Sequence, residues 1–105
     1  MVIYIMVDFS LIAGFEWDEG NARKSADKPG VSKGEAEQAF FNAPLLPTGD
    51  EKHSIAEGRF HALGKTDAGR KLHMTFTLRG EGRLIRVVSA RDMSRKERTR
   101  YDEED

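Results

Sequence analysis

The clearest pattern in the chain is an alternation of apolar and polar residues between positions 72 and 79. Such a period of two predicts a β-strand that turns one set of side chains to the core and the other set to water or a ligand. The apolar set is Leu72, Met74, Phe76 and Leu78, and the polar set is His73, Thr75, Thr77 and Arg79.

Two further strands are expected beside this one. Residues 59–65 predict a preceding strand, and the Gly-containing segment 66–70 predicts the hairpin turn that joins the two. Residues 84–91 are more continuously apolar, which is typical of a central strand, and Gly80-Glu81-Gly82 supplies the turn before them. The second half of the chain is therefore expected to form an antiparallel sheet.

The first half begins with a short predicted strand over residues 11–17. Asp18 is a suitable N-cap for a weak helix over residues 19–27. Pro29 and Gly30 end that helix, because proline disfavours helical backbone in the residue before it and glycine frees the turn.

A second helix is predicted from a capping box at Ser32 and Glu35, and it runs to about Phe41. One face of it carries the apolar residues Ala36, Ala39, Phe40 and Ala43. Residues 44–58 hold two prolines and several charges, so we expect either a short strand at Leu45-Leu46 or a functional loop.

A second capping box, at Ser94 and Glu97, predicts a terminal helix. Its basic residues lie near the positive end of the helix dipole and its acidic residues 102–105 near the negative end, which costs a few tenths of a kcal/mol up to ~1 for each exposed charge. Contact with a partner would account for this order, and a frayed, solvated tail would account for it equally.

These elements predict an α+β fold: an N-terminal strand and two helices, then an antiparallel sheet of about three to four strands and a C-terminal helix. The length of 105 residues predicts one domain over residues 1–105, with residues 1–10 as a possible N-terminal extension. The absence of cysteine excludes disulfides and thiolate metal sites and fits the cytoplasm. The apolar segment Met1 to Met6 is too short to cross a membrane, and it lacks the basic region of a secretory signal, so no membrane partner is expected.

Charge is distributed very unevenly along the chain. Residues 1–58 hold 10 Asp/Glu and 5 Lys/Arg, a net of −5, whereas residues 59–100 hold 12 Lys/Arg and 4 Asp/Glu, a net of +8. The four acids of residues 101–105 bring the total to −1. Nine of the twelve basic residues are arginines, whose planar fork suits phosphate and carboxylate. This pattern is compatible with an anionic partner, either a nucleic acid or an acidic protein, and equally with an ordinary solvated surface.

The chemistry best matched by these residues is cleavage of RNA. The ribose 2′-hydroxyl is an internal nucleophile, so the reaction needs a base, cations that stabilise the pentavalent phosphate, and an acid for the leaving oxygen. Arginines in or beside three neighbouring predicted strands would supply the cations: Arg59, Arg79, Arg86 and Arg91. The candidates for the base or the acid are Glu57, His53, His61 or His73.

Other arrangements stay open. The arginines could be edge charges of the sheet, paired with Glu57 or Glu97, and Arg86 and Arg91 should point to opposite faces unless a bulge intervenes. A metal site has no support in the histidine spacing, and we expect neither a metal nor another cofactor.

Several segments in order resemble the BrnT-type toxins, over about residues 13–102. The segments that carry the resemblance are Phe15-Glu16-Trp17-Asp18-Glu19, Lys28-Pro29-Gly30-Val31-Ser32, Ala36 with Phe40, His53, Glu57 with Arg59-Phe60, Leu63-Gly64, Gly69-Arg70, Thr77-Leu78-Arg79, Ile85 to Arg91, and Glu97-Arg98 with Tyr101. The most specific part is the run Ile85-Arg86-Val87-Val88-Ser89-Ala90-Arg91 with the following Glu97-Arg98 and Tyr101.

This resemblance implies a RelE-like ribonuclease toxin that inhibits translation by cleaving RNA. It implies a co-encoded, DNA-binding antitoxin of the BrnA type, through which alone the complex contacts operator DNA, and a dimer or a heterotetramer with the antitoxin. The basic sheet and the terminal helix would then contact RNA, the antitoxin or both, and the expected RNA-binding residues are Lys28, His61, His73 and Arg95.

The chain departs from the family pattern at two places. Pro29 stands where the family usually has histidine, and Gly58 stands where it often has glutamate. These departures motivate an alternative function, in which a degenerate toxin binds a protein or a nucleic acid without catalysis.

Overall fold

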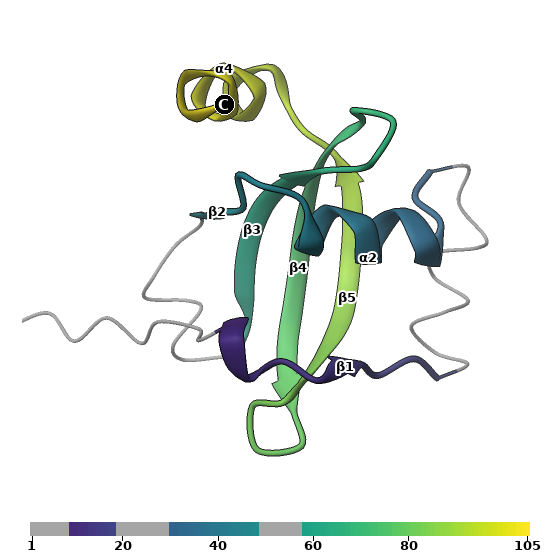
Figure 1. The fold of residues 1–105 in the computed structure, drawn as a ribbon. Coiled ribbons are helices and arrows are strands. Elements are labelled where there is room, and N and C mark those ends of the chain that lie inside the picture. The colour runs from purple at the N-terminus through teal and green to yellow at the C-terminus, as the bar shows by residue number, and fades with distance from the viewer. Residues whose placement is uncertain (1–8, 19–29, 49–57) are drawn as a thin grey trace, which may run out of the picture.

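The computed structural model describes residues 9–18, 30–48 and 58–105. Within them the chain forms one mixed sheet, with one helix across a face of it and the C-terminal helix at one end of its strands (Figure 1). The elements are η1 (Phe9–Leu11), β1 (Gly14–Phe15), α2 (Lys33–Phe41), β2 (Leu46–Thr48), β3 (Phe60–Lys65), β4 (Lys71–Arg79), β5 (Leu84–Asp92) and α4 (Arg95–Glu104). The helix expected over residues 19–27 lies outside the described residues, as do residues 1–8 of the expected N-terminal extension over residues 1–10.

The three long strands form the antiparallel meander that the sequence predicts. Strand β4 pairs with β3 on one side and with β5 on the other, and Gly69, at a φ of 86°, closes the expected turn between β3 and β4. The apolar set of β4 faces the core as predicted, since Leu72, Met74 and Phe76 are each at most 1% exposed. Strand β5 is interior, between β1 and β4, but β4 rather than β5 occupies the middle of the sheet.

The prediction of an antiparallel sheet of three to four strands is wrong in two respects, because the described residues form a sheet of five strands in the order β1-β5-β4-β3-β2 and one pair is parallel. Strand β1 pairs in parallel with the edge of β5 that β4 leaves free, through hydrogen bonds such as Glu16 N to Ile85 O at 2.9 Å. It is also shorter than the predicted strand over residues 11–17, of which Leu11 belongs to η1 and only Gly14 and Phe15 are paired in the sheet. The strand expected near Leu45-Leu46 is β2, which adds the fifth strand beside β3.

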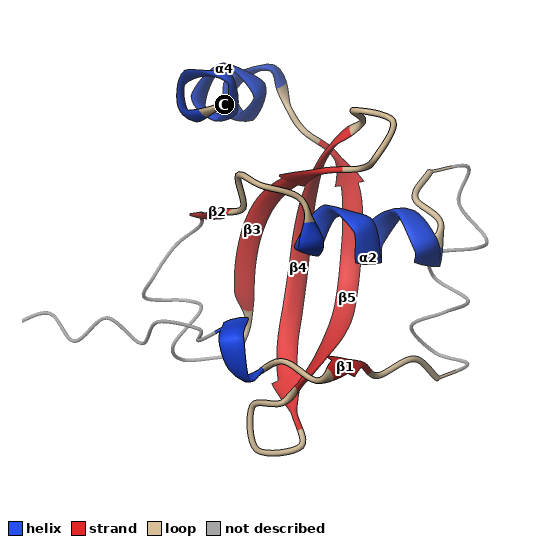
Figure 2. Ribbon diagram, viewed as in Figure 1, coloured by secondary structure: helices blue, strands red, loops and turns tan. Residues whose placement is uncertain are grey.

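Helix α2 lies across one face of β3, β4 and β5 (Figure 2), and we call this the inner face of the sheet. The predicted capping box is present, since the Ser32 hydroxyl accepts from Glu35 N and the Glu35 carboxylate accepts from Ser32 N. Close packing against the sheet needs a glycine at position 64, because a Cβ there would collide with the backbone carbonyl of Ala39.

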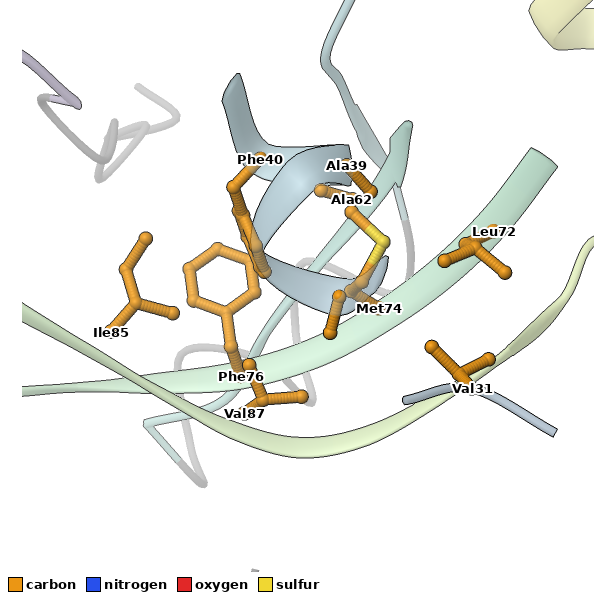
Figure 3. Close-up of a cluster of buried hydrophobic side chains, with 10 residues drawn as sticks. Val31, Ala39, Phe40, Ala62, Leu72, Met74, Phe76, Ile85 and Val87 are labelled. Atoms are coloured by element: carbon orange, nitrogen blue, oxygen red, sulfur yellow. The ribbon is translucent and has the colours of Figure 1, made fainter. Parts of the chain in front are cut away.

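The core between α2 and the sheet contains aliphatic and aromatic side chains from α2, β3, β4 and β5 (Figure 3). Phe40 of α2 meets Phe76 of β4 edge to face, with ring centroids 5.0 Å apart. Such pairs add about 0.5–1.5 kcal/mol to the area they bury. The inner face is therefore filled, and it leaves the opposite face of the sheet for other contacts.

Helix α4 packs on that opposite face, which we call the outer face, at the end where β5 finishes. A second apolar cluster of Leu63, Met93 and Tyr101 anchors it, and the Tyr101 hydroxyl donates to the Pro44 carbonyl at 2.7 Å. The acidic end of the helix is explained by tertiary contacts. Asp102 pairs with Lys71 of β4, and Asp105 pairs with Lys65 of β3. The order of charges that opposes the helix dipole thus serves the docking of α4 on the sheet.

None of the helices in the described ranges is long and apolar enough to cross a membrane.

Candidate functional site

The outer face of the sheet gathers most of the residues that the sequence singles out. The alternation of β4 places His73, Thr75, Thr77 and Arg79 there. The pairing of strands then arranges polar residues in three rows across β3, β4 and β5. One row holds His73 and Arg91, the next holds His61, Thr75 and Ser89, and the third holds Thr77 and Arg86. Successive rows are about 7 Å apart along the strands.

A β-bulge decides that Arg86 and Arg91 share this face. Thr75 pairs with Ser89 and the next residue, Phe76, pairs with Val87, so Val88 is the extra residue of β5. Without it, the five-residue separation would place the two arginines on opposite faces. The bulge that the sequence analysis required for a shared face is therefore present. The two arginines nevertheless remain about 14 Å apart along the sheet.

Arg91 belongs to a polar cluster under the start of α4. Its guanidinium donates to both oxygens of Glu97, at 2.8 and 3.0 Å, and His73 Nε2 lies 3.8 Å from Glu97 Oε2. The hydrogen bond from Arg91 lowers the pKa of Glu97 to about 2, against partial burial. Burial lowers the pKa of His73, and the nearby Arg91 charge adds to this. At neutral pH the cluster therefore holds an ion pair beside an uncharged imidazole.

His61 and His73 approach each other across β3 and β4. Their ring centroids are 5.3 Å apart, and His61 Nδ1 lies 3.0 Å from the Thr75 hydroxyl. Thr75 is 9% exposed, so the hydroxyl that contacts His61 belongs to a buried residue. The structure thus brings together two of the residues expected to contact RNA.

Arg86 is also paired with carboxylates. Its guanidinium donates to Asp18 Oδ2 at 2.6 Å and to Glu16 Oε1 at 3.3 Å, just after β1. The hydrogen bonds to Asp18 raise the pKa of Arg86 further above its usual range. An anion that approaches this arginine must share it with these two acids.

Arg79 and Arg59 lie near Arg86. Arg79 is exposed at the end of β4, and among the described residues its side chain has no hydrogen-bond or ion-pair partner. Extending the β3–β4 register by one residue beyond Phe60 places Arg59 opposite Thr77. By strand register, three arginines from three chain segments therefore start from positions near Thr77, at the end of the outer face away from α4.

The remaining expected residues are placed differently. Arg95 is exposed in the first turn of α4, outside the rows on the sheet. Lys28, His53 and Glu57 lie outside the described residues. No group of three or more histidine or acidic side chains in the described ranges is arranged to hold a metal ion.

The structural role of Arg70 is not apparent from the sequence. Its guanidinium donates to both oxygens of Asp92, at 2.7 and 3.1 Å, and also to Glu35 and the Gly30 carbonyl. These bonds lower the pKa of Asp92 and join the end of β5 to the start of α2. No local pattern signals this role, because the partners lie 22 and 35 residues away.

Comparison with known proteins gives one family. Residues 17–97 match the model described as the ribonuclease toxin, BrnT, of a type II toxin–antitoxin system. No curated protein matches the chain. The matched range covers the described residues from Trp17 to Glu97. It therefore includes the outer face of the sheet and its arginines Arg59, Arg79, Arg86 and Arg91. The chain belongs to the BrnT family of ribonuclease toxins.

Proposed function

We propose that this protein is a metal-independent endoribonuclease that inhibits translation by cleaving RNA, and that its site is the outer face of the sheet. The observation that carries the proposal is the location of arginines and histidines, in and beside three adjoining strands, on that one face. Family membership supports the same chemistry. The α+β architecture agrees with the RelE-like fold that the family resemblance implies.

The arginines have the role of stabilising phosphate charge. As the 2′-oxygen attacks phosphorus, negative charge grows on the phosphoryl oxygens, and guanidinium forks donate to two oxygens at once. The proposed phosphate-binding residues are Arg59, Arg79, Arg86 and Arg91. Proton transfer falls to Glu57 or to a histidine, and Lys28, His61, His73 and Arg95 are proposed to contact RNA.

The carboxylate partners of Arg86 and Arg91 bear on this mechanism. Each of these arginines is held in one orientation by an acid, which positions the fork but lowers its net attraction for phosphate. Arg79 has no such competitor among the described residues. We therefore expect Arg79 to make the largest single contribution to RNA binding on this face.

The test is RNA cleavage by purified protein in EDTA. Arg79→Ala is expected to lower the cleavage rate about 100- to 1000-fold, in the range found when one donor to a transition-state oxyanion is removed. Arg83→Ala is the matched control, because Arg83 is an exposed arginine of the neighbouring turn and has no assigned role. Full activity of Arg79→Ala would remove this residue from the site.

A second candidate function is a non-catalytic toxin relative that is retained for partner binding. The pairing of Arg86 and Arg91 with acids favours it, because paired arginines attract phosphate less strongly. The Pro29 departure from the family pattern favours it as well. Expression without any partner separates the two, since growth arrest supports the ribonuclease and harmless accumulation supports the binding module.

The proposed partner is an antitoxin of the BrnA type, which would neutralise the toxin in the cytoplasm and carry the complex to operator DNA. A dimer or a heterotetramer with the antitoxin is the expected assembly. Co-expression with the product of an adjacent short gene should restore growth, and size-exclusion chromatography with light scattering would give the stoichiometry.

A further inference from the structure

The middle row of the outer face differs from the rows on either side of it. Arg91 lies in the row toward α4, and Arg86 lies in the row toward the β4–β5 turn. Between them the middle row holds His61, Thr75 and Ser89, which carry no guanidinium. Strands β3, β4 and β5 lie side by side here (Figure 1). A phosphate held between the two arginine rows would therefore sit over an imidazole.

The contact with Thr75 leaves one nitrogen of His61 available. The hydroxyl occupies Nδ1 at 3.0 Å, and Nε2 has no partner among the described residues. Thr75 is buried in the middle strand of the sheet, so its hydroxyl limits the orientation of the ring. One ring nitrogen is thus held and the other is free to exchange a proton.

The charged groups around this imidazole come from several elements. His73 of β4 lies beside it, with Arg91 of β5 opposite His73 and Glu97 of α4 paired to Arg91. Arg59 precedes the strand that carries His61. Because the pKa of His73 is lowered by burial, that neighbour adds no positive charge at neutral pH, and Glu97 offsets Arg91.

We propose that His61 is the residue that accepts the 2′-hydroxyl proton when RNA is cleaved on this face, and that Thr75 is its positioning residue. This proposal rests on the proposed ribonuclease function and assigns one step of it. His61 Nε2 takes the proton as the 2′-oxygen bonds to phosphorus. The bond from phosphorus to the 5′-oxygen breaks, and the leaving oxygen takes a proton from water. The products are a 2′,3′-cyclic phosphate and a 5′-hydroxyl end, and the imidazolium returns its proton to the solvent.

The first experiment compares His61→Gln with wild type on a short RNA in EDTA. Loss of a positioned acid–base group is expected to lower the single-turnover cleavage rate about 10²- to 10⁴-fold. The loss of RNA affinity should be much smaller than the loss of rate, because the arginine rows are intact. Arg83→Gln, in the neighbouring turn, is the control and should match wild type in both measurements.

Two further measurements distinguish proton transfer from a structural role. Added imidazole should restore part of the activity of His61→Ala, which a merely structural defect would not allow. Thr75→Val should lower kcat while KM is kept, and Thr75→Ser, which retains the hydroxyl, should recover the rate. Urea denaturation midpoints report whether each variant is folded.

The outcomes separate this assignment from the proposed function. If wild type cleaves RNA and folded His61→Gln cleaves at the wild-type rate, the assignment to His61 is wrong and the ribonuclease proposal stands. If wild type cleaves no RNA, the ribonuclease proposal itself fails and the assignment fails with it. Products with a 5′-phosphate instead of a 2′,3′-cyclic end would also overturn the assignment.

Discussion

The substitution Glu97→Gln tests how α4 is held on the sheet. Glu97 accepts hydrogen bonds from both terminal nitrogens of Arg91 and from the backbone N–H of Ser94, and it lies near His73. The amide keeps the size of the side chain and can still accept from Ser94. The change therefore removes the charge of the ion pair with little effect on packing.

The expected loss of stability follows from the pKa of this carboxyl. A fall from the 4.5 of an ordinary glutamate to about 2 corresponds to about 3 kcal/mol of stability at neutral pH. Because the Arg91 side chain is 54% exposed, water screens the pair, and we expect about 1–2 kcal/mol at pH 7.

The sign of the pH dependence follows from the same values. The folded pKa lies below the unfolded one, so the unfolded state binds more protons between them, and the stabilisation by Glu97 is lost as pH falls from about 5 to about 2. The difference between wild type and Glu97→Gln should therefore be largest at neutral pH and shrink steadily toward pH 2.

Urea denaturation followed by the fluorescence of Trp17, the single tryptophan, measures this difference. Glu103→Gln on the same helix is the control, because Glu103 is exposed and has no ion-pair partner among the described residues. It should change the free energy of unfolding by less than about 0.5 kcal/mol. An equal destabilisation of Glu97→Gln at pH 3 and pH 7, or none at pH 7, would refute the reasoning.

Two further substitutions test the fold. Gly64→Ala should destabilise the protein by about 1–3 kcal/mol in urea denaturation, because the new Cβ meets the backbone of Ala39, which cannot rotate away. Gly34→Ala is the control, because a Cβ at that position meets no other atom, and it should be neutral or stabilising by up to about 1 kcal/mol. Arg70→Gln should lower the free energy of unfolding by about 1–2 kcal/mol at pH 7 and by less at acid pH, because protonation of Asp92 weakens the Arg70–Asp92 pair in wild type. A loss of stability that is the same at pH 3 and pH 7 would contradict this account.

Local patterns were sufficient for much of the secondary structure. Both capping boxes, at Ser32 and Ser94, are present as predicted, because the side chain and the backbone groups that it caps lie within four residues. The period of two in β4 was equally informative, since it depends only on which face of a strand is buried. The candidate arginines and histidines could be named for the same reason, from residue type and expected strand.

The arrangement of the candidate site needed contacts between distant segments. A bulge at Val88 brings Arg86 and Arg91 to one face, and no residue type in β5 predicts this bulge. The pairing of Arg86 with Asp18 spans 68 residues. The contact of His61 with Thr75 depends on the register of two strands. Each of these is a consequence of which strands pair and where.

The amino-acid sequence by itself determined the residue types available for chemistry, the strong local elements and the resemblance to the BrnT family, because these depend on short-range preferences and on the order of motifs. Only the tertiary structure decided that β1 joins the sheet in parallel, that α4 docks its acidic end on two lysines of the sheet, and which arginines are held by acids. The physical reason is that hydrogen bonds and ion pairs between remote segments are selected by the packing of the whole chain.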